Sequence, residues 1–138
     1  MSNPPVERQP DVEMTPVLAA VIRRGDRYLI CQRPPHKRHG GLWEFPGGKL
    51  ETNETLLDAA TRELREELAV VARQVDASLL AVADPGSPFI IEFVPTLIEG
   101  EPTCLEHAEI RWALLEELSE LPLAPSDRKF VDFILANG

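Results

Sequence analysis

The stretch 48–70, GKLETNETLLDAATRELREELAV, constrains the fold more than any other part of the chain. At about 100° per residue, Glu63, Glu66 and Glu67 fall on one face of a helix, because spacings of three and four return to the same side. An apolar stripe repeats on the adjoining face: Leu57, Ala60, Leu64 and Leu68. The pattern predicts a helix that docks on a core through one face and presents three carboxylates on the other.

Three neighbouring carboxylates repel one another unless a cation lies among them. Oxygen ligands of this kind suit the hard divalent cations Mg²⁺ and Mn²⁺. Upstream, Pro46-Gly47-Gly48 supplies a turn whose backbone approaches an ion or a phosphate closely. Thr55, followed three residues later by Asp58, fits a capping box at the helix start.

An ordinary surface helix is the alternative, since Arg62 and Arg65 stand beside the acids and can pair with them. The joint spacing of the glycine turn, Glu54 and the acidic block favours the metal site.

This stretch resembles the Nudix hydrolase signature. The matching positions are Gly48, Glu54, Arg62, Glu63, Leu64, Glu66, Glu67 and Val70. Ala69 stands where the signature has a glycine that ends the helix in a left-handed conformation. Alanine there costs about 1 kcal/mol, so we expect a shifted helix end and an intact site. The resemblance implies an α/β fold, the Nudix α/β/α sandwich with a mixed β-sheet between helices.

The remaining pattern is compatible with that fold. Apolar runs between turns predict strands at 17–23, 28–32, 79–83 and 89–98. A short helix is expected at 114–121 and a last helix within 123–137, with Ser126 as its cap and three apolar residues at helical spacing: Phe130, Phe133 and Ile134.

Composition sets the domain organisation. A chain of 138 residues suits one domain, which we predict as a flexible lead-in at 1–14 and a Nudix domain at 15–138. No apolar run is long enough to span a membrane, and the N-terminus lacks the basic and then apolar regions of a secretory signal peptide. Cys31 and Cys104 lack metal-type spacing and are expected to be reduced, which predicts a cytoplasmic protein.

The net charge of -9 argues against an extended nucleic-acid surface. It does not exclude nucleotides, because a bound metal inverts the local sign of charge. The segment 33–49 carries much of the positive charge. We predict that Arg33 and Lys49 contact phosphate, whereas 36–39 suits either phosphate binding or a solvated loop. Trp43 is expected either to contact the substrate or to pack in the core.

The resemblance also implies the site residues. The metal ligands would be Gly47, Glu63, Glu66, Glu67 and Glu106, and the catalytic residues Glu63, Glu66, Glu67, Arg62 and Glu106. Arg62 would orient the glutamates, and either Glu66 or Glu106 would be the base. Glu106 is placed by length matching, with an exposed loop acid as the alternative; His107 is expected to be structural or solvent-facing.

The substrate would be bound by Arg33, Lys49, Phe45 and Asp127. Asp127 matches the position at the start of the last helix that reads the base edge in MutT-like relatives. An ionised carboxylate there would accept hydrogen bonds only; its alternative role is to interact with the helix dipole.

The implied reaction is Mg²⁺- or Mn²⁺-dependent hydrolysis of nucleoside or deoxynucleoside triphosphates, oxidised ones such as 8-oxo-dGTP included, to monophosphate and pyrophosphate. An ADP-ribose or nucleotide-sugar pyrophosphatase is the alternative, suggested by Pro85 sixteen residues after Ala69, although a turn explains that proline equally well. A non-catalytic nucleotide-binding module is disfavoured because all three helix glutamates are present. The expected state is a monomer or homodimer.

Overall fold

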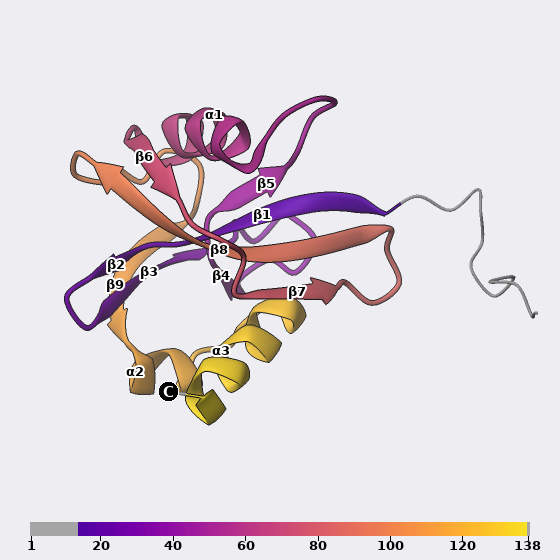
Figure 1. The fold of residues 1–138 in the computed structure, drawn as a ribbon. Helices are drawn as coiled ribbons and strands as arrows, with labels where there is room; N and C mark the ends of the chain where they lie inside the picture. Colours follow the sequence, from indigo (N-terminus) through magenta and orange to yellow (C-terminus); the bar gives the residue numbers. More distant parts are fainter. Residues whose placement is uncertain (1–13, 138) are drawn as a thin grey trace, which may run out of the picture.

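Strands lie between helices on two sides in the computed structural model of the protein, which describes residues 14–137 (Figure 1). The elements in chain order are β1 (Thr15–Val21), β2 (Arg23–Arg24), β3 (Arg27–Gln32), β4 (Trp43–Glu44), β5 (Gly47–Lys49), α1 (Leu56–Leu68), β6 (Val71–Val75), β7 (Leu80–Ala83), β8 (Phe89–Glu99), β9 (Glu109–Leu114), α2 (Leu115–Glu120) and α3 (Pro125–Asn137). Apart from Met14, the predicted lead-in lies outside the described residues. No helix among residues 14–137 is long and apolar enough to cross a membrane.

The strands form two hydrogen-bonded sheets. One has the order β5-β1-β8-β6, with β7 also paired to β8; the other has the order β2-β3-β4, with β9 paired to β3. The β1–β8 pair is parallel and the other named pairs are antiparallel. The predicted α/β class with mixed strand directions is therefore confirmed, although the strands divide between two sheets.

Strand β1 is buried on both faces. Leu18 and Ala20 join the apolar cluster under α1, whereas Ala19 and Val21 join the cluster formed with α2 and α3. Because successive strand residues point to opposite faces, a strand covered on both sides reads as an uninterrupted apolar run. This explains why the sequence at β1 shows no alternation with polar residues.

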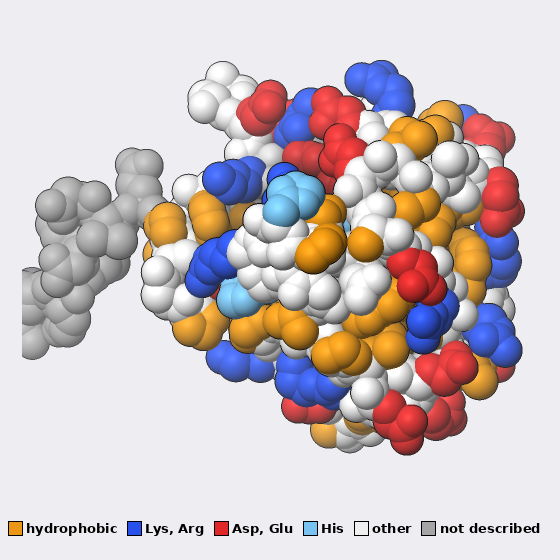
Figure 2. Space-filling view, turned by 180° about the vertical axis from the view of Figure 1, so that it is seen from behind, with side chains coloured by type: hydrophobic (Ala, Val, Ile, Leu, Met, Phe, Trp, Pro, Cys, Tyr) orange, Lys and Arg blue, Asp and Glu red, His pale blue; other side chains and the backbone are white. Residues whose placement is uncertain are grey.

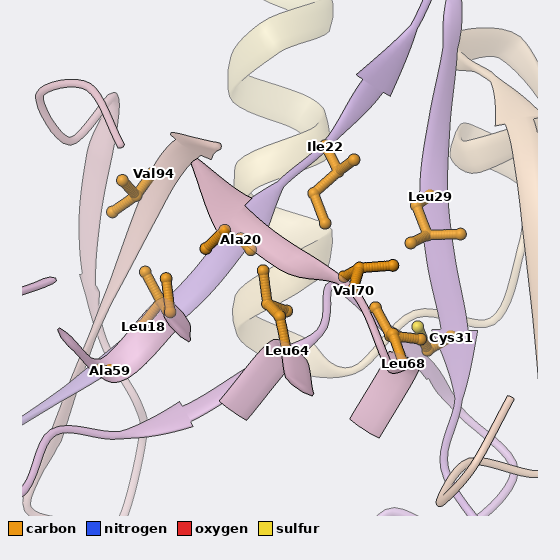
Figure 3. Packing of buried hydrophobic residues seen from close by; sticks show 12 residues of the cluster. Leu18, Ala20, Ile22, Leu29, Cys31, Ala59, Leu64, Leu68, Val70 and Val94 are labelled. Atoms are coloured by element: carbon orange, nitrogen blue, oxygen red, sulfur yellow. The ribbon is translucent and has the colours of Figure 1, made fainter. Parts of the chain in front are cut away.

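The predicted helix corresponds to α1, and its capping box is confirmed. The Asp58 amide donates to the Thr55 hydroxyl over 3.0 Å, and the Thr55 amide donates to the Asp58 carboxylate over 3.0 Å. The apolar stripe is confirmed for Ala60, Leu64 and Leu68, which are fully buried. In Figure 3 the side chains of Leu64 and Leu68 lie among those of the strands.

The prediction for Leu57 is wrong, because this side chain is 40% exposed. Leu57 belongs to the first helical turn, where Ala59 is buried and Leu56 packs against the cluster instead.

The expected shift of the helix end is also wrong. Ala69 itself takes the left-handed conformation, with φ 57° and ψ 37°, and its amide donates to the carbonyls of Arg65 and Leu64. Leu68 and Val70 on either side are buried, so the chain must turn at this residue to enter β6. Packing therefore keeps the helix end in place although alanine is strained there.

The last helix differs at its start. Because α3 begins at Pro125, Ser126 lies inside the first turn, and its predicted capping role is wrong. The Ser126 hydroxyl hydrogen-bonds the Asp84 carboxylate instead, over 3.1 Å. Phe130 is fully buried and stacks on Phe93 with ring centroids 4.4 Å apart. This stacking fixes the N-terminal half of α3 against β8.

Ala69→Gly is expected to raise the free energy of unfolding by about 1 kcal/mol, because glycine adopts a positive φ without the steric conflict of a Cβ atom. Urea denaturation monitored by circular dichroism measures the change. Ala108→Gly is the matched control, since Ala108 has no positive φ and a glycine there only adds freedom to the unfolded chain. An unchanged or lower stability of Ala69→Gly would contradict the strain described for this residue.

Candidate active site

The glycine turn lies directly against two carboxyl groups of α1. The Gly47 amide donates to Glu67 Oε1 over 3.3 Å. A Cβ atom on Gly48 would overlap the carboxyl group of Glu63. The missing side chain at Gly48 is therefore what allows Glu63 to approach the turn, and both glutamates meet the backbone of β5.

Glu67 is a buried acid next to a second acid. Burial raises its pKa first, and a hydrogen bond to Glu63 together with the charge of Glu63 adds to the effect, giving a pKa of about 9. A cation between these oxygens would reverse the shift, because opposite charge favours the ionised form. A hard divalent cation fits this donor set, which consists of carboxylate oxygens beside a strand backbone.

Arg62 is the cation that already lies beside this pair. It donates from Nη1 to Glu63 over 2.9 Å, from Nη2 to Glu54 over 2.7 Å and to the Lys49 carbonyl over 3.0 Å. Its hydrogen bonds to Glu54 lower the pKa of that carboxyl group to about 2. Arg62 thus holds Glu63 and the end of β5 in one arrangement.

The five predicted metal ligands do not form one preformed cage. In the part of the chain that the structure describes, no group of three His, Cys, Asp or Glu side chains is placed to hold a metal ion. Gly47, Glu63 and Glu67 come together, whereas Glu66 and Glu106 are exposed. Glu66 and Glu67 are consecutive and therefore lie about 100° apart around the helix, so burial of Glu67 turns Glu66 outward. Glu106 still reaches the site, since it lines a small cavity with Glu67 and Gly47.

A larger cavity of about 280 Å³ adjoins the glycine turn. Its walls contain all four residues predicted to bind the substrate: Arg33, Phe45, Lys49 and Asp127. Gly47 lines both this cavity and the smaller one, so the two cavities adjoin at the glycine turn.

The four substrate candidates differ in what they offer. Arg33 Nη1 donates to both carboxylate oxygens of Glu44, over 3.0 and 3.2 Å, and its Nε donates to the Arg38 carbonyl. Lys49 places Nζ 4.7 Å from the Phe89 ring centroid. Phe45 is mainly a core residue, packed edge-on against Phe130 with ring centroids 5.4 Å apart.

Asp127 lies in the wall of the larger cavity. Its Oδ2 accepts a hydrogen bond from the Phe45 amide over 2.9 Å, and the residue is only 6% exposed. Burial raises its pKa to about 8, with a further contribution from the charge of Glu44. This shift favours a protonated carboxyl group, which can donate as well as accept, whereas the sequence suggested an ionised carboxylate that only accepts.

Sequence reasoning missed two side chains in the site. Glu44 precedes the glycine turn and pairs with Arg33; its place in LWEF next to the turn was a signal that could have found it. His107 is buried between Glu44 and Glu67, whereas a structural or solvent-facing role was expected. No local pattern marks His107, because its two neighbours in space come from β4 and α1.

Charge on the surface is mixed. Figure 2 shows acidic and basic side chains interspersed on the face turned away from the viewer in Figure 1. The basic residues do not merge into one broad area on that face.

Helices on two sides of mixed strands, with a glutamate-bearing helix directly after a glycine turn, define the architecture of a hydrolase of the Nudix class. The chain belongs to the NUDIX domain family, which it matches over residues 14–134. The predicted membership of the Nudix hydrolases, a class of enzymes, is confirmed.

Three relatives illustrate the similarity. The CTP pyrophosphohydrolase of Escherichia coli (strain K12) is 36% identical over 128 residues, which cover 91% of this chain and 94% of that protein. The solution structure of the E. coli ORF135 protein is 34% identical, covers 94% of each chain and superposes with a TM-score of 0.79. The 8-oxo-dGTP diphosphatase of Proteus vulgaris is 48% identical over 59 residues, 42% of this chain and 53% of that protein. The predicted Nudix α/β/α sandwich is thereby confirmed.

Glu54→Gln is expected to remove a stabilising ion pair whose effect depends on pH. The pKa of Glu54 in the folded protein, about 2, lies below its ordinary value of 4.5, so the pair stabilises the fold above about pH 4.5 and is lost as the pH falls toward 2. The gap in unfolding free energy between wild type and variant should therefore narrow between about pH 6 and pH 2.5. Urea titrations across this range measure it. Glu120→Gln, an exposed change on α2, is the control and should give a constant gap; a constant gap for Glu54→Gln would contradict the ion pair.

Proposed function

We propose that the protein hydrolyses nucleoside triphosphates to the monophosphate and pyrophosphate with Mg²⁺ or Mn²⁺. The observation that carries this proposal is that two cavities share three wall residues: Arg33, Glu44 and Gly47. The larger cavity has room for part of a nucleotide, and the smaller one is walled by Glu67 and Glu106. A base at Asp127 and a triphosphate directed toward Glu67 would use both.

The metal would be held by Glu63, Glu67 and the Gly47 carbonyl, with Glu66 and Glu106 as further ligands, and would neutralise phosphate charge and acidify a bound water. The donor set supports this, because the carboxyl groups of Glu63 and Glu67 are adjacent and mostly shielded from solvent.

The chain's own residues would do the rest. The oxygen of water bonds to a phosphorus within the triphosphate while the bond from that phosphorus to its bridging oxygen breaks, and a carboxylate takes the proton of the water. Of the two candidate bases, Glu106 is favoured over Glu66, since it lines the smaller cavity. Arg62 would orient Glu63, and Arg33 and Lys49 would contact phosphate.

Asp127 is proposed to read the base. A protonated carboxyl group presents one donor and one acceptor side by side. Each standard base offers an acceptor beside a donor on one edge, for example N3 and the N4 amino group of cytosine or O6 and N1–H of guanine, so a protonated Asp127 could pair with any of them. The names of two relatives make triphosphates of cytosine and of guanine, oxidised guanine included, the substrates to test first.

The alternatives receive less support. Pro85 is exposed in the β7–β8 turn and lines neither cavity, so the feature that suggested an ADP-ribose or nucleotide-sugar pyrophosphatase has a local explanation. A non-catalytic module would not need the buried Glu67 beside Glu63. We further propose a cytoplasmic enzyme, acting as a monomer or homodimer, without an extended nucleic-acid surface.

Glu67→Gln is expected to lower turnover by more than about a hundredfold, because one charge leaves the carboxylate pair while no core atom is lost. Wild type and variant are incubated with Mg²⁺ and a panel of triphosphates, 8-oxo-dGTP, ADP-ribose and nucleotide sugars, and the released monophosphate and pyrophosphate are measured. Glu116→Gln, the same chemical change on the exposed surface of α2, is the control.

Near-normal turnover of Glu67→Gln at saturating Mg²⁺ would contradict the ligand assignment. Preferential hydrolysis of ADP-ribose or nucleotide sugars by the wild type would replace the triphosphate proposal, and a lack of hydrolysis with retained nucleotide binding would favour the non-catalytic module.

Asp127→Ala is expected to flatten the preference among bases more than it slows hydrolysis of the best substrate. Because the protonated form is the one proposed to bind, kcat/KM of the wild type should fall as the pH rises through about 8. Asp127→Asn keeps one donor and one acceptor without titrating, so it should retain the preference and lose this alkaline fall. Asp132→Ala, an exposed acid on the same helix, is the control. An unchanged base preference in Asp127→Ala would remove Asp127 from the base site.

A further inference from the structure

The segment 101–108 is fastened to the site along its length. The Thr103 amide donates to the Leu68 carbonyl over 2.8 Å, and the Leu105 amide donates to the Glu67 carbonyl over 3.1 Å. At its far end the Ala108 amide donates to the Gln32 carbonyl of β3 over 2.9 Å. The backbone on both sides of His107 is therefore fixed, to the C-terminal end of α1 on one side and to β3 on the other.

This anchoring carries the imidazole of His107 into the smaller cavity between two carboxylates. Its side chain is only 7% exposed. Nε2 lies 3.5 Å from Glu44 Oε2 and 3.8 Å from Glu67 Oε1. Nδ1 is buried and has no hydrogen-bond partner within the described residues. A purely apolar side chain would fill this space without burying a ring nitrogen, so packing alone does not account for a histidine here.

Glu44 is held from its other side by Arg33. The Arg33 guanidinium contacts both carboxylate oxygens of Glu44 from Nη1 and fastens its Nε to the Arg38 carbonyl. The contacts thus run from Arg33 through Glu44 to His107 and then to Glu67. This series of contacts links Arg33, which is proposed to contact phosphate, to Glu67, the buried acid proposed to hold the metal.

Without the imidazole, the carboxyl groups of Glu44 and Glu67 would share one partly buried cavity with no side chain between them. Arg33 would then be the remaining side chain that holds Glu44. The imidazole fills this space, and Nε2 lies within 4 Å of an oxygen of each carboxyl group. A proton on Nε2 lets the ring donate toward them, because an ionised carboxylate only accepts hydrogen bonds.

We propose that His107 is a positioning residue: it holds Glu44, and through Glu44 the phosphate-binding Arg33, at a fixed distance from Glu67. This inference rests on the proposed nucleotide substrate. It assigns His107 no contact with the substrate and no proton transfer. Its effect is on substrate affinity, because the residue acts on the arrangement of Arg33 rather than on the bonds that break.

The test compares His107→Gln with His107→Leu. Glutamine places an amide donor near the position of Nε2, whereas leucine fills similar space without a donor. We expect His107→Leu to raise KM and to weaken binding of a non-hydrolysable triphosphate in EDTA by about tenfold, with kcat changed less than about threefold. For His107→Gln, the KM, the affinity for the triphosphate and kcat should all stay close to the wild-type values. Urea denaturation of each variant reports any separate loss of stability.

A double-mutant cycle with Glu44→Gln tests the route of the effect. If His107 acts through Glu44, the double variant His107→Leu/Glu44→Gln should bind the triphosphate no more weakly than Glu44→Gln alone. Effects that add would overturn the proposal. So would a His107→Gln variant as weak as His107→Leu, or unchanged affinity in His107→Leu.

If the leucine variant does not fold, His107→Asn takes its place, since its amide is too short to reach both carboxylates and the same loss of affinity is expected. Wild-type protein that binds the triphosphate but does not hydrolyse it would defeat the proposed function alone. Wild-type protein that does not bind it would defeat both.

Discussion

The docking of α1 on the two sheets is the contact on which the rest of this structure depends. Leu64 and Leu68 are fully buried among residues of β1, β3 and β8 (Figure 3), and this burial sets the rotation of the helix about its axis. Once that rotation is set, Glu67 can only point toward the glycine turn, where it accepts a hydrogen bond from Gly47. An apolar contact thus places a buried acid, although charge alone would keep it in water.

The site is assembled at the meeting point of segments that are far apart in the chain. The turn before α1 supplies close backbone, the 101–108 segment supplies His107 and Glu106, and the start of α3 supplies Asp127. They are held in different ways: Phe130 stacks on Phe93 and so sets the start of α3, whereas backbone hydrogen bonds to Leu68, Glu67 and Gln32 hold the 101–108 segment. The chemistry of the site therefore depends on both packing and backbone hydrogen bonds between remote segments.

Local patterns predicted much of the fold. The capping box at Thr55 and the buried positions Leu64 and Leu68 follow from residues within one helix, where spacing decides which side chains meet. Predictions failed where another segment decided the outcome. Leu57 lies on the predicted stripe but beyond the core, and Ser126 is drawn to Asp84 instead of capping α3. The strands β4 and β5, of two and three residues, are too short for a periodic signal.

The sequence by itself determined the family, the carboxylate-bearing helix and most of the candidate site, because these depend on spacings of a few residues. Only the tertiary structure decided that Glu67 is buried while Glu66 is exposed, that burial raises the pKa of Asp127, and that His107 lies between two carboxyl groups. Burial and the distance between charges depend on which remote segments pack together, and no local pattern in a chain encodes that distance.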